Sequence, residues 1–270
     1  MTTMQQYLAA AEDVADEVIR SGRKVIPKVG KICLIASFLE DGLRMLYQWD
    51  EQREFVEETW LCGGFLATLF VLINMVGQLG GCLMVMAGNK TNVAVRVLLS
   101  IVLLQIMTYS IFWNLQILLL KLGLIGALLL ALAEAQMEQH RNLFAGLPSV
   151  GDNRSTIFMQ LIGRTLLAFM FIGLIRFQLN VLQMIQDIGT SLLMIFVVLG
   201  YRTKLSALIL VALLTVLNLY HNAWWNIPNY RPLRDYLKYS FFQTLTVIGG
   251  LLMIVSLGPG RVSLDAKKKW

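Results

Sequence analysis

The feature that most constrains this chain is a series of long apolar runs, which recurs from residue 29 almost to the C-terminus. In 60–87 and 116–134, for example, leucine, valine, isoleucine and glycine follow one another with few charges. A transmembrane helix needs about 20 predominantly apolar residues. Runs of this length fold as helices, because hydrocarbon offers the backbone no other hydrogen-bond partner. The sequence therefore predicts an all-α, polytopic membrane protein.

Turn signals and polar breaks divide these runs into about eight expected spans. The expected spans are 29–49, 60–87, 93–113, 116–134, 157–177, 182–199, 205–225 and 239–257. We expect an acidic loop at 50–58 and the main polar break at 135–156. Residues 3–24 have the pattern of an amphipathic helix that lies on or near the membrane, and Pro27 is expected to end it.

Three short matches indicate that the chain contains two similar halves. Residues 30–34 resemble 163–167, residues 88–90 resemble 200–202, and residues 125–129 resemble 248–252. Their common order predicts two four-helix pseudo-repeats, 29–135 and 157–258. The remaining segments are a cytosolic amphipathic N-terminal segment, 1–28, a cytosolic linker, 136–156, and a cytosolic tail, 259–270.

The distribution of charge predicts the orientation in the membrane. The net charge is +6, but the basic residues lie mainly in short loops and tails, where positive-inside sorting places them. The charge therefore indicates contact with membrane lipid and gives no reason to expect nucleic acid as a partner. An even number of spans puts both termini on one side, and loop charge assigns that side to the cytosol.

The last four residues, 267–270, have the spacing expected of a sorting signal. Lys267 and Lys268 stand fourth and third from the carboxyl end. This is the spacing of a di-lysine address, which the coat that returns proteins from the Golgi to the endoplasmic reticulum reads. Such a terminal signal is read by a receptor and does not anchor the chain. The alternative is a solvated basic tail beside anionic lipid.

The first expected span carries a charged cluster, Glu40, Asp41 and Arg44. A charge at the bilayer centre costs about 2.5–3.5 kcal/mol on insertion scales, and both carboxylates can reach Arg44 along the helix surface. One cation against two acids leaves a surplus negative charge. Two interpretations remain open: an ion network that locks this helix to its neighbours, or a lumenal pocket for a cation such as a free amino terminus. In the second, Asp41→Asn should weaken binding with little loss of protein.

Aromatic residues gather at the expected lumenal ends of the spans. Most of them fit an interfacial belt, but Trp60 and Tyr239 are candidates to hold the apolar residues of a bound peptide. Cys33, Cys62 and Cys82 fall in apolar segments without paired spacing, so we expect small buried residues rather than disulfides or metal ligands. No phosphate loop or nucleophile constellation stands out, so we expect no cofactor, no metal, no catalytic residue and no enzyme.

Residues 38–45, 241–244 and 247–252, together with the lysine-rich end, resemble the Surfeit locus protein 4 family. The resemblance runs nearly end to end, from Ala11 to Trp270. It implies a cargo receptor that binds soluble secretory proteins in the lumen of the endoplasmic reticulum through a short N-terminal hydrophobic–proline–hydrophobic signal. It also implies an outward vesicle coat and a retrieval coat as partners.

The location implied by this resemblance is the membrane of the endoplasmic reticulum, with cycling through the intermediate compartment and early Golgi. A homo-oligomer is left open. The alternative function is a small-solute transporter or a membrane oxidoreductase subunit of the early secretory pathway. It is kept because polar span residues such as Gln105, Glu134 and Gln243 would also suit a solute path.

Overall fold

The structure of the protein is a computed structural model. It describes residues 3–88, 90–109, 111–143, 154–174, 181–228, 231–258, 260 and 263. The elements in these ranges are helices: α1 (Thr3–Gly22), α2 (Ile26–Tyr47), α3 (Trp49–Trp60), α4 (Gly64–Met86), α5 (Thr91–Thr108), η1 (Ile111–Trp113), α6 (Leu115–Leu143), α7 (Arg154–Leu174), α8 (Val181–Leu199), α9 (Thr203–His221), η2 (Trp224–Asn226) and α10 (Pro232–Leu257). The prediction of an all-α protein is confirmed.

Within the described ranges, six helices are long and apolar enough to cross a membrane, namely α4, α5, α6, α7, α9 and α10. The prediction of a multi-pass membrane protein therefore holds. Helix length and composition identify six candidate spans among the described residues, fewer than the expected eight. α2 is long enough but carries charged residues such as Lys31 and Asp41. α8 is 19 residues long, and its stretch Met184–Leu199 is apolar.

Several expected boundaries differ from the structure, and three of the differences are the largest. The expected acidic loop at 50–58 is the helix α3, because its one buried residue, Val56, packs against α4 while its acidic side chains stay outside. α6 continues to Leu143, past its expected end at 134. α10 begins at Pro232, where proline fits the first turn of a helix because its missing N–H would have no partner there.

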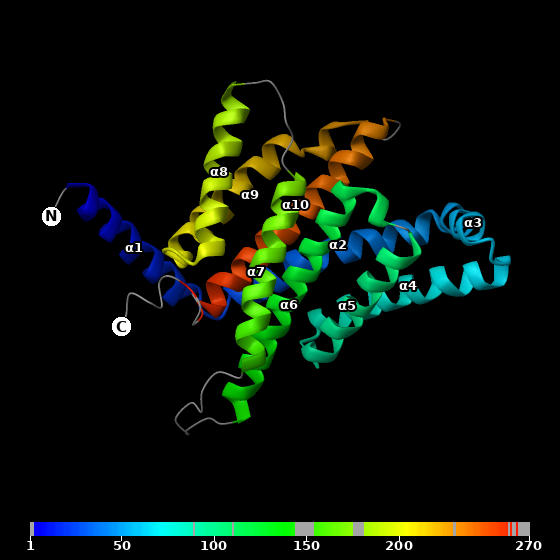
Figure 1. Ribbon diagram of the computed structural model, residues 1–270, viewed down its shortest axis with the longest axis horizontal. Helices are drawn as coiled ribbons and strands as arrows, with labels where there is room; N and C mark the ends of the chain where they lie inside the picture. The colour runs from blue at the N-terminus through cyan, green and yellow to red at the C-terminus, as the bar shows by residue number, and fades with distance from the viewer. Residues whose placement is uncertain are drawn as a thin grey trace.

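Two helix pairs form the centre of the molecule. α2 packs along α10, and α6 packs along α7, and α10 also contacts α6 (Figure 1). Glycines let the backbones touch in both pairs: a Cβ at Gly249 would lie 2.7 Å from the carbonyl oxygen of Gly30, and one at Gly126 would lie 2.7 Å from that of Gly163. Such close approach through small residues is the usual way in which helices associate in membranes.

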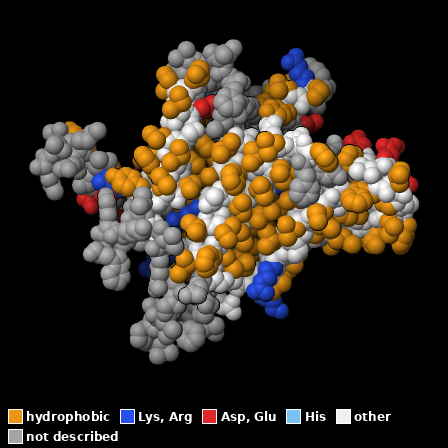
Figure 2. Space-filling view, viewed as in Figure 1, with side chains coloured by type: hydrophobic (Ala, Val, Ile, Leu, Met, Phe, Trp, Pro, Cys, Tyr) orange, Lys and Arg blue, Asp and Glu red, His pale blue; other side chains and the backbone are white. Residues whose placement is uncertain are grey.

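Apolar side chains cover much of the molecular surface. Figure 2 shows hydrophobic side chains over most of one face, with acidic side chains gathered over α3. Exposed large residues such as Phe65, Val76 and Ile195 lie on helices that are not buried by other helices on that side. In water this surface would be unfavourable, so its extent agrees with a bundle surrounded by lipid.

Two ion pairs attach the N-terminal helix α1 to the turn before α9 and to the first turn of α9. Arg202 Nε lies 3.1 Å from Glu12 Oε1, and Lys204 Nζ lies 2.9 Å from Asp16 Oδ1. Glu12 and Asp16 are one helical turn apart, so they present their carboxylates on the same face. The prediction of an N-terminal helix is confirmed.

Candidate functional site

A polar network inside the bundle is centred on the carboxylate of Asp41. The guanidinium of Arg44, one turn further along α2, donates to Oδ1. Gln78 Nε2 of α4 donates to Oδ2 at 2.9 Å, and Gln105 Nε2 of α5 donates to the same oxygen at 3.3 Å. Gln105 Oε1 in turn accepts from Lys121 Nζ of α6 at 2.9 Å. Asp41 therefore joins four helices and has a donor for each oxygen.

Glu40, the neighbouring carboxylate, has a different environment. Its Oε1 lies 3.6 Å from Lys238 Nζ of α10, and its side chain is 7% exposed. This distance is longer than a normal hydrogen bond. Lys238 itself is more open, with 36% of its side chain exposed. Glu40 is thus a buried acid, and its charge partner among the described residues is the partly exposed Lys238, 3.6 Å away.

The charge balance of the site differs from the expected one. Lys121 and Lys238 join Arg44, so three cations stand near the two acids Glu40 and Asp41. The expected surplus of one negative charge is therefore wrong, because the sequence pattern counted only charges on α2. A buried acid is tolerated when it is paired and hydrogen-bonded, which is the situation of Asp41.

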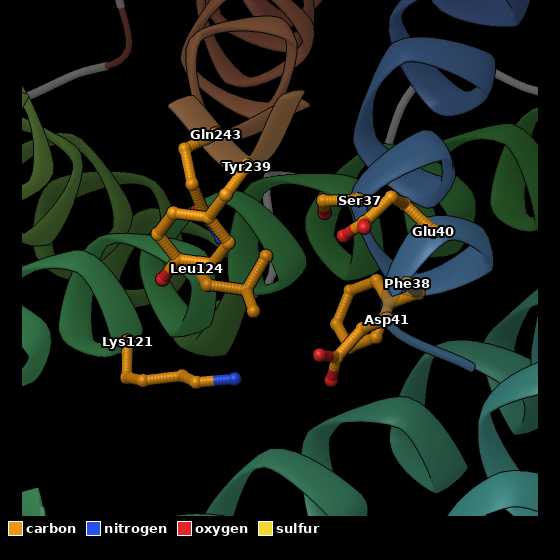
Figure 3. A pocket seen from close by; sticks show the side chains of 8 residues that line it. All are labelled: Ser37, Phe38, Glu40, Asp41, Lys121, Leu124, Tyr239 and Gln243. Carbon is orange, nitrogen blue, oxygen red and sulfur yellow. The ribbon is translucent and has the colours of Figure 1, made fainter. Parts of the chain in front are cut away.

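A small cavity lies between the two carboxylates and α10. Its lining consists of Ser37, Phe38, Glu40, Asp41, Lys121, Leu124, Tyr239 and Gln243. In Figure 3, Asp41 and Lys121 extend toward one another, while the carboxylate of Glu40 faces the side chains of α10. The volume of the cavity is about 10 Å³, about enough for one water-sized group. A whole amino-acid side chain does not fit without movement of the helices.

The site lies near one end of the bundle. Glu40 is about 10 Å from the end of α2 at Tyr47, at about 1.5 Å of rise per residue. Tyr239 is about as far from the start of α10 at Pro232, by the same rise. Gln105 and Lys121 also stand near the end of α5 and the start of α6. These residues of α2, α5, α6 and α10 therefore lie within about two helical turns of the helix ends at one end of the bundle, whereas Gln78 lies in the middle of α4.

Comparison with known proteins places this chain in a family. The model of the SURF4 family matches residues 5–270. The chain belongs to the SURF4 family. The match begins in α1 and includes all of the site residues, so the resemblance predicted from the sequence is confirmed.

Among relatives of this SURF4-family chain, the Surfeit locus protein 4 homolog of Drosophila melanogaster is 65% identical, over 100% of both chains. The Surfeit locus protein 4 homolog of Schizosaccharomyces pombe is 33% identical, over 90% of this chain and 82% of that protein. The ER-derived vesicles protein ERV29 of Saccharomyces cerevisiae is 29% identical, over 99% of this chain and 85% of that protein. No solved structure matches the chain.

The structure of the SURF4-family chain brings most of the predicted lumenal site residues together. The guanidinium of Arg44 lies 5.8 Å from the ring centre of Tyr239, beside Glu40 and Asp41. Trp60 is elsewhere: it ends α3, donates from Nε1 to the carbonyl oxygen of Thr108 at 2.7 Å, and is not among the residues that line the cavity. Lys267 and Lys268, the predicted sorting signal, lie outside the described residues.

Three residues of the site were not predicted: Gln78, Lys121 and Lys238. Lys121 gave a usable signal, because it is the one charged residue in the apolar run 115–133 and a lysine there needs a partner. Gln78 gave a weaker signal of the same kind. Lys238 precedes the expected start of the last span at 239, so it read as a loop residue; α10 begins seven residues earlier than that expectation, at Pro232.

The remaining predicted polar and sulfur residues of the SURF4-family chain lie in ordinary packing environments. Glu134 Oε2 lies 2.7 Å from Lys31 Nζ. This ion pair is near the start of α2, whereas Asp41 is near its end. Cys82 is buried, Cys33 and Cys62 are partly buried, and all of them are free thiols. Glu134 is therefore separate from the network at Asp41, which weakens the idea of one continuous solute path through the bundle.

Proposed function

We propose that this protein is a cargo receptor. It binds soluble secretory proteins in the lumen of the endoplasmic reticulum through their N-terminal signal, packages them for transport to the Golgi, and returns by its C-terminal di-lysine signal. The observation that carries the proposal is the SURF4-family match over residues 5–270, with a relative that is named an ER-derived vesicles protein. This places the role in vesicle traffic of the early secretory pathway rather than in enzymatic chemistry.

The proposed membrane arrangement has about eight spans and adds α2 and α8 to the six apolar helices. α2 is 22 residues long, which gives about 33 Å, against about 30 Å for the hydrocarbon core. Its charges do not forbid a span, because Asp41 and Lys31 are paired with other helices. An even count puts both termini on the same side, and loop charge assigns that side to the cytosol. The di-lysine experiment below tests this for the C-terminus.

The two predicted pseudo-repeats are part of the proposal, and the turns support them. Gly88 and Gly200 both have positive φ, +68° and +73°. The basic residues two positions later, Lys90 and Arg202, also have positive φ, 50° and 44°. A positive φ at a non-glycine residue is uncommon, so the same two backbone conformations occur twice at positions that the sequence matches had paired.

The glycine crossings support the same pseudo-repeats. Gly30 and Gly163 are paired by the sequence matches, and so are Gly126 and Gly249. Gly30 contacts Gly249, and Gly163 contacts Gly126. The first helix of each half thus crosses the last helix of the other half, as expected for two related halves that exchange equivalent contacts.

We place the cargo's amino terminus at the cavity beside Glu40 and Tyr239. Asp41 and Arg44 hold the shape of this site, because Asp41 is already bonded to Arg44, Gln78 and Gln105. Trp60 is 53% exposed. It bonds to Thr108 at the same end of the bundle, so it offers an apolar surface to residues that follow the amino terminus.

The proposal predicts selective retention of cargo in cells that lack this protein. Soluble secretory proteins with the N-terminal signal should accumulate in the endoplasmic reticulum, while other secreted proteins leave at their normal rate. Quantitative proteomics of the medium measures this, with re-expression of the wild-type chain as the control. An unchanged secretome with altered flux of a small solute would contradict the receptor and support the transporter alternative.

A second prediction concerns the sorting signal at Lys267 and Lys268. Changing both to serine should move the protein from the early secretory pathway to later compartments, because the retrieval coat loses its two cationic contacts. Imaging against markers of each compartment measures the shift, and Lys269→Ser is the matched control because it keeps the two signal positions. Since the coat is cytosolic, an unchanged location would contradict either the address or the cytosolic side of the tail.

A further inference from the structure

The two carboxylates of the site differ in how well they are satisfied. Asp41 accepts from three side chains, on its own helix and on α4 and α5. Glu40 is paired with Lys238 across 3.6 Å, and no shorter polar contact of its carboxylate is found within the described part of the chain. Glu40 therefore keeps most of its capacity to accept hydrogen bonds, although it is buried.

Gln243 adds a second acceptor beside the same cavity. Gln243 is 6% exposed and lines the cavity one turn after Tyr239 on α10. Its Oε1 is buried without a hydrogen-bond partner among the described residues. A buried acceptor without a hydrogen-bond partner is unfavourable, so a ligand that donates to it would be stabilised. Gln243 and Glu40 together therefore indicate a donor-rich ligand.

The size and lining of the cavity define the class of that ligand. The volume of about 10 Å³ admits about one water-sized group, and a primary ammonium is of that size. An ammonium brings three donors, which suit the acceptors of Glu40 and Gln243. The ring of Tyr239, which also lines the cavity, favours a cation.

We propose that Lys238 occupies the place of the ligand on Glu40, and that a cargo's N-terminal ammonium binds there by exchanging with it. This deepens the proposed function and rests on it. Lys238 is well placed to leave, because 36% of its side chain is exposed and its long flexible stem can carry the charge to the membrane surface. Glu40 stays paired throughout, so no step leaves a lone carboxylate in a region of low dielectric constant.

The exchange explains how the site rejects the wrong amino terminus. An acetylated terminus carries no charge, so it cannot replace Lys238 on Glu40. It would have to enter the cavity while the Glu40–Lys238 pair stays in place or leave Glu40 unpaired. Because a ligand must replace Lys238 as the partner of Glu40, the site binds a charged amine in preference to a neutral amide.

The test uses the purified full-length chain in lipid nanodiscs and a short peptide that begins Leu-Pro-Leu, with a fluorophore at its C-terminus. The peptide is made with a free and with an acetylated amino terminus. Lys238→Met should bind the free peptide about three- to tenfold more tightly than the wild type, because the competing ion pair is gone. Lys238→Arg, which keeps a cation, and Lys204→Met, which removes a lysine from a distant ion pair, should bind like the wild type.

Variants of the acceptors complete the test. Glu40→Gln should abolish the preference for the free peptide, and Gln243→Leu should reduce it. Lys238→Gln serves as a second neutral variant if Lys238→Met is poorly folded, and peptide should raise the melting temperature of either variant more than that of the wild type.

Two results separate the inference from the proposed function. If the wild type prefers the free peptide but both neutral Lys238 variants bind it no more tightly, the exchange is overturned and the amine site stands. If the wild type shows no preference, the amine site and the exchange are both overturned, and the secretome experiment alone decides whether the chain is a receptor.

Discussion

Replacing Asp41 by asparagine should cause a large loss of folded protein. The Asp41 carboxylate accepts from Arg44, Gln78 and Gln105, and an asparagine would turn one of its two acceptor oxygens into a donor facing other donors. Arg44 and Lys121 would also lose their counter-charge. Removing one partner from a buried ionic network costs about 3–5 kcal/mol, so we expect a marked fall in abundance and in melting temperature.

The measurement is fluorescence-detected size-exclusion of the tagged chain before and after heating. Asp16→Asn is the matched control, because Asp16 pairs with Lys204 at the surface with 60% of its side chain exposed, and exposed pairs contribute about 0–1 kcal/mol. From the sequence alone we expected Asp41→Asn to weaken binding at normal protein level. Normal abundance and melting of Asp41→Asn would contradict the network seen here and restore that expectation.

Gly126→Ala should destabilise the bundle at the crossing of α6 and α7. The added Cβ would lie 2.6 Å from the Cβ of Leu166, 2.7 Å from the carbonyl oxygen of Gly163 and 2.9 Å from the backbone nitrogen of Leu167. Two of these neighbours are backbone atoms, so the helices themselves must move apart. Overpacking costs about 1–3 kcal/mol, and a forced backbone shift places this variant at the upper end of that range or above it.

Gly80→Ala is the control for this prediction. Gly80 also lies within a helix, α4, and a Cβ there would meet no atom within 4 Å. Alanine is more favourable than glycine in a helix by about 0.5–1 kcal/mol, so Gly80→Ala should be neutral or slightly stabilising. The measurement is the melting temperature of both variants in the same detergent. Equal melting temperatures would contradict the prediction, because they would show that α6 and α7 can move apart at this crossing without loss of stability.

The glycine crossings and the Asp41 network make different contributions to the same bundle. The crossings bring α2 to α10 and α6 to α7 by backbone contact, without charge. The network then fixes how these pairs sit against α4 and α5, since Gln78 and Gln105 both reach Asp41. A variant in the crossing should therefore lower stability with the amine preference intact in the protein that folds, whereas Glu40→Gln should remove that preference without unfolding the bundle.

Much of the fold could be predicted from local sequence. The apolar runs predicted most of the helices, because a run long enough to cross hydrocarbon has no alternative to helix. The ends were predicted less well: α6 continues to Leu143 instead of 134, and α10 begins at Pro232 instead of 239. The acidic segment at 50–58 was mistaken for a loop, because its one buried residue, Val56, is recognised only once α4 lies beside it. The density of acidic residues led to the wrong prediction of a loop, since a short helix can expose its acidic side chains and still bury one apolar side chain.

For the charged cluster, the sequence predicted only part of the hydrogen-bond network. Spacing along one helix predicted the pairing of Asp41 with Arg44, because residues three apart share a helix face. It could not predict Gln78, Gln105 or Lys121, which belong to other helices. Their approach depends on helix packing, and packing depends on where small residues let backbones touch.

The sequence by itself determined the class of the protein: its long apolar runs require helices in a membrane, and its SURF4-family pattern runs nearly from end to end. The tertiary structure alone decided which carboxylate is already satisfied and which is open to a ligand. Glu40 and Asp41 are adjacent in sequence and equal in charge, but adjacent residues of a helix point about 100° apart. One therefore meets the amides of α4 and α5, and the other meets Lys238 and the cavity beside α10.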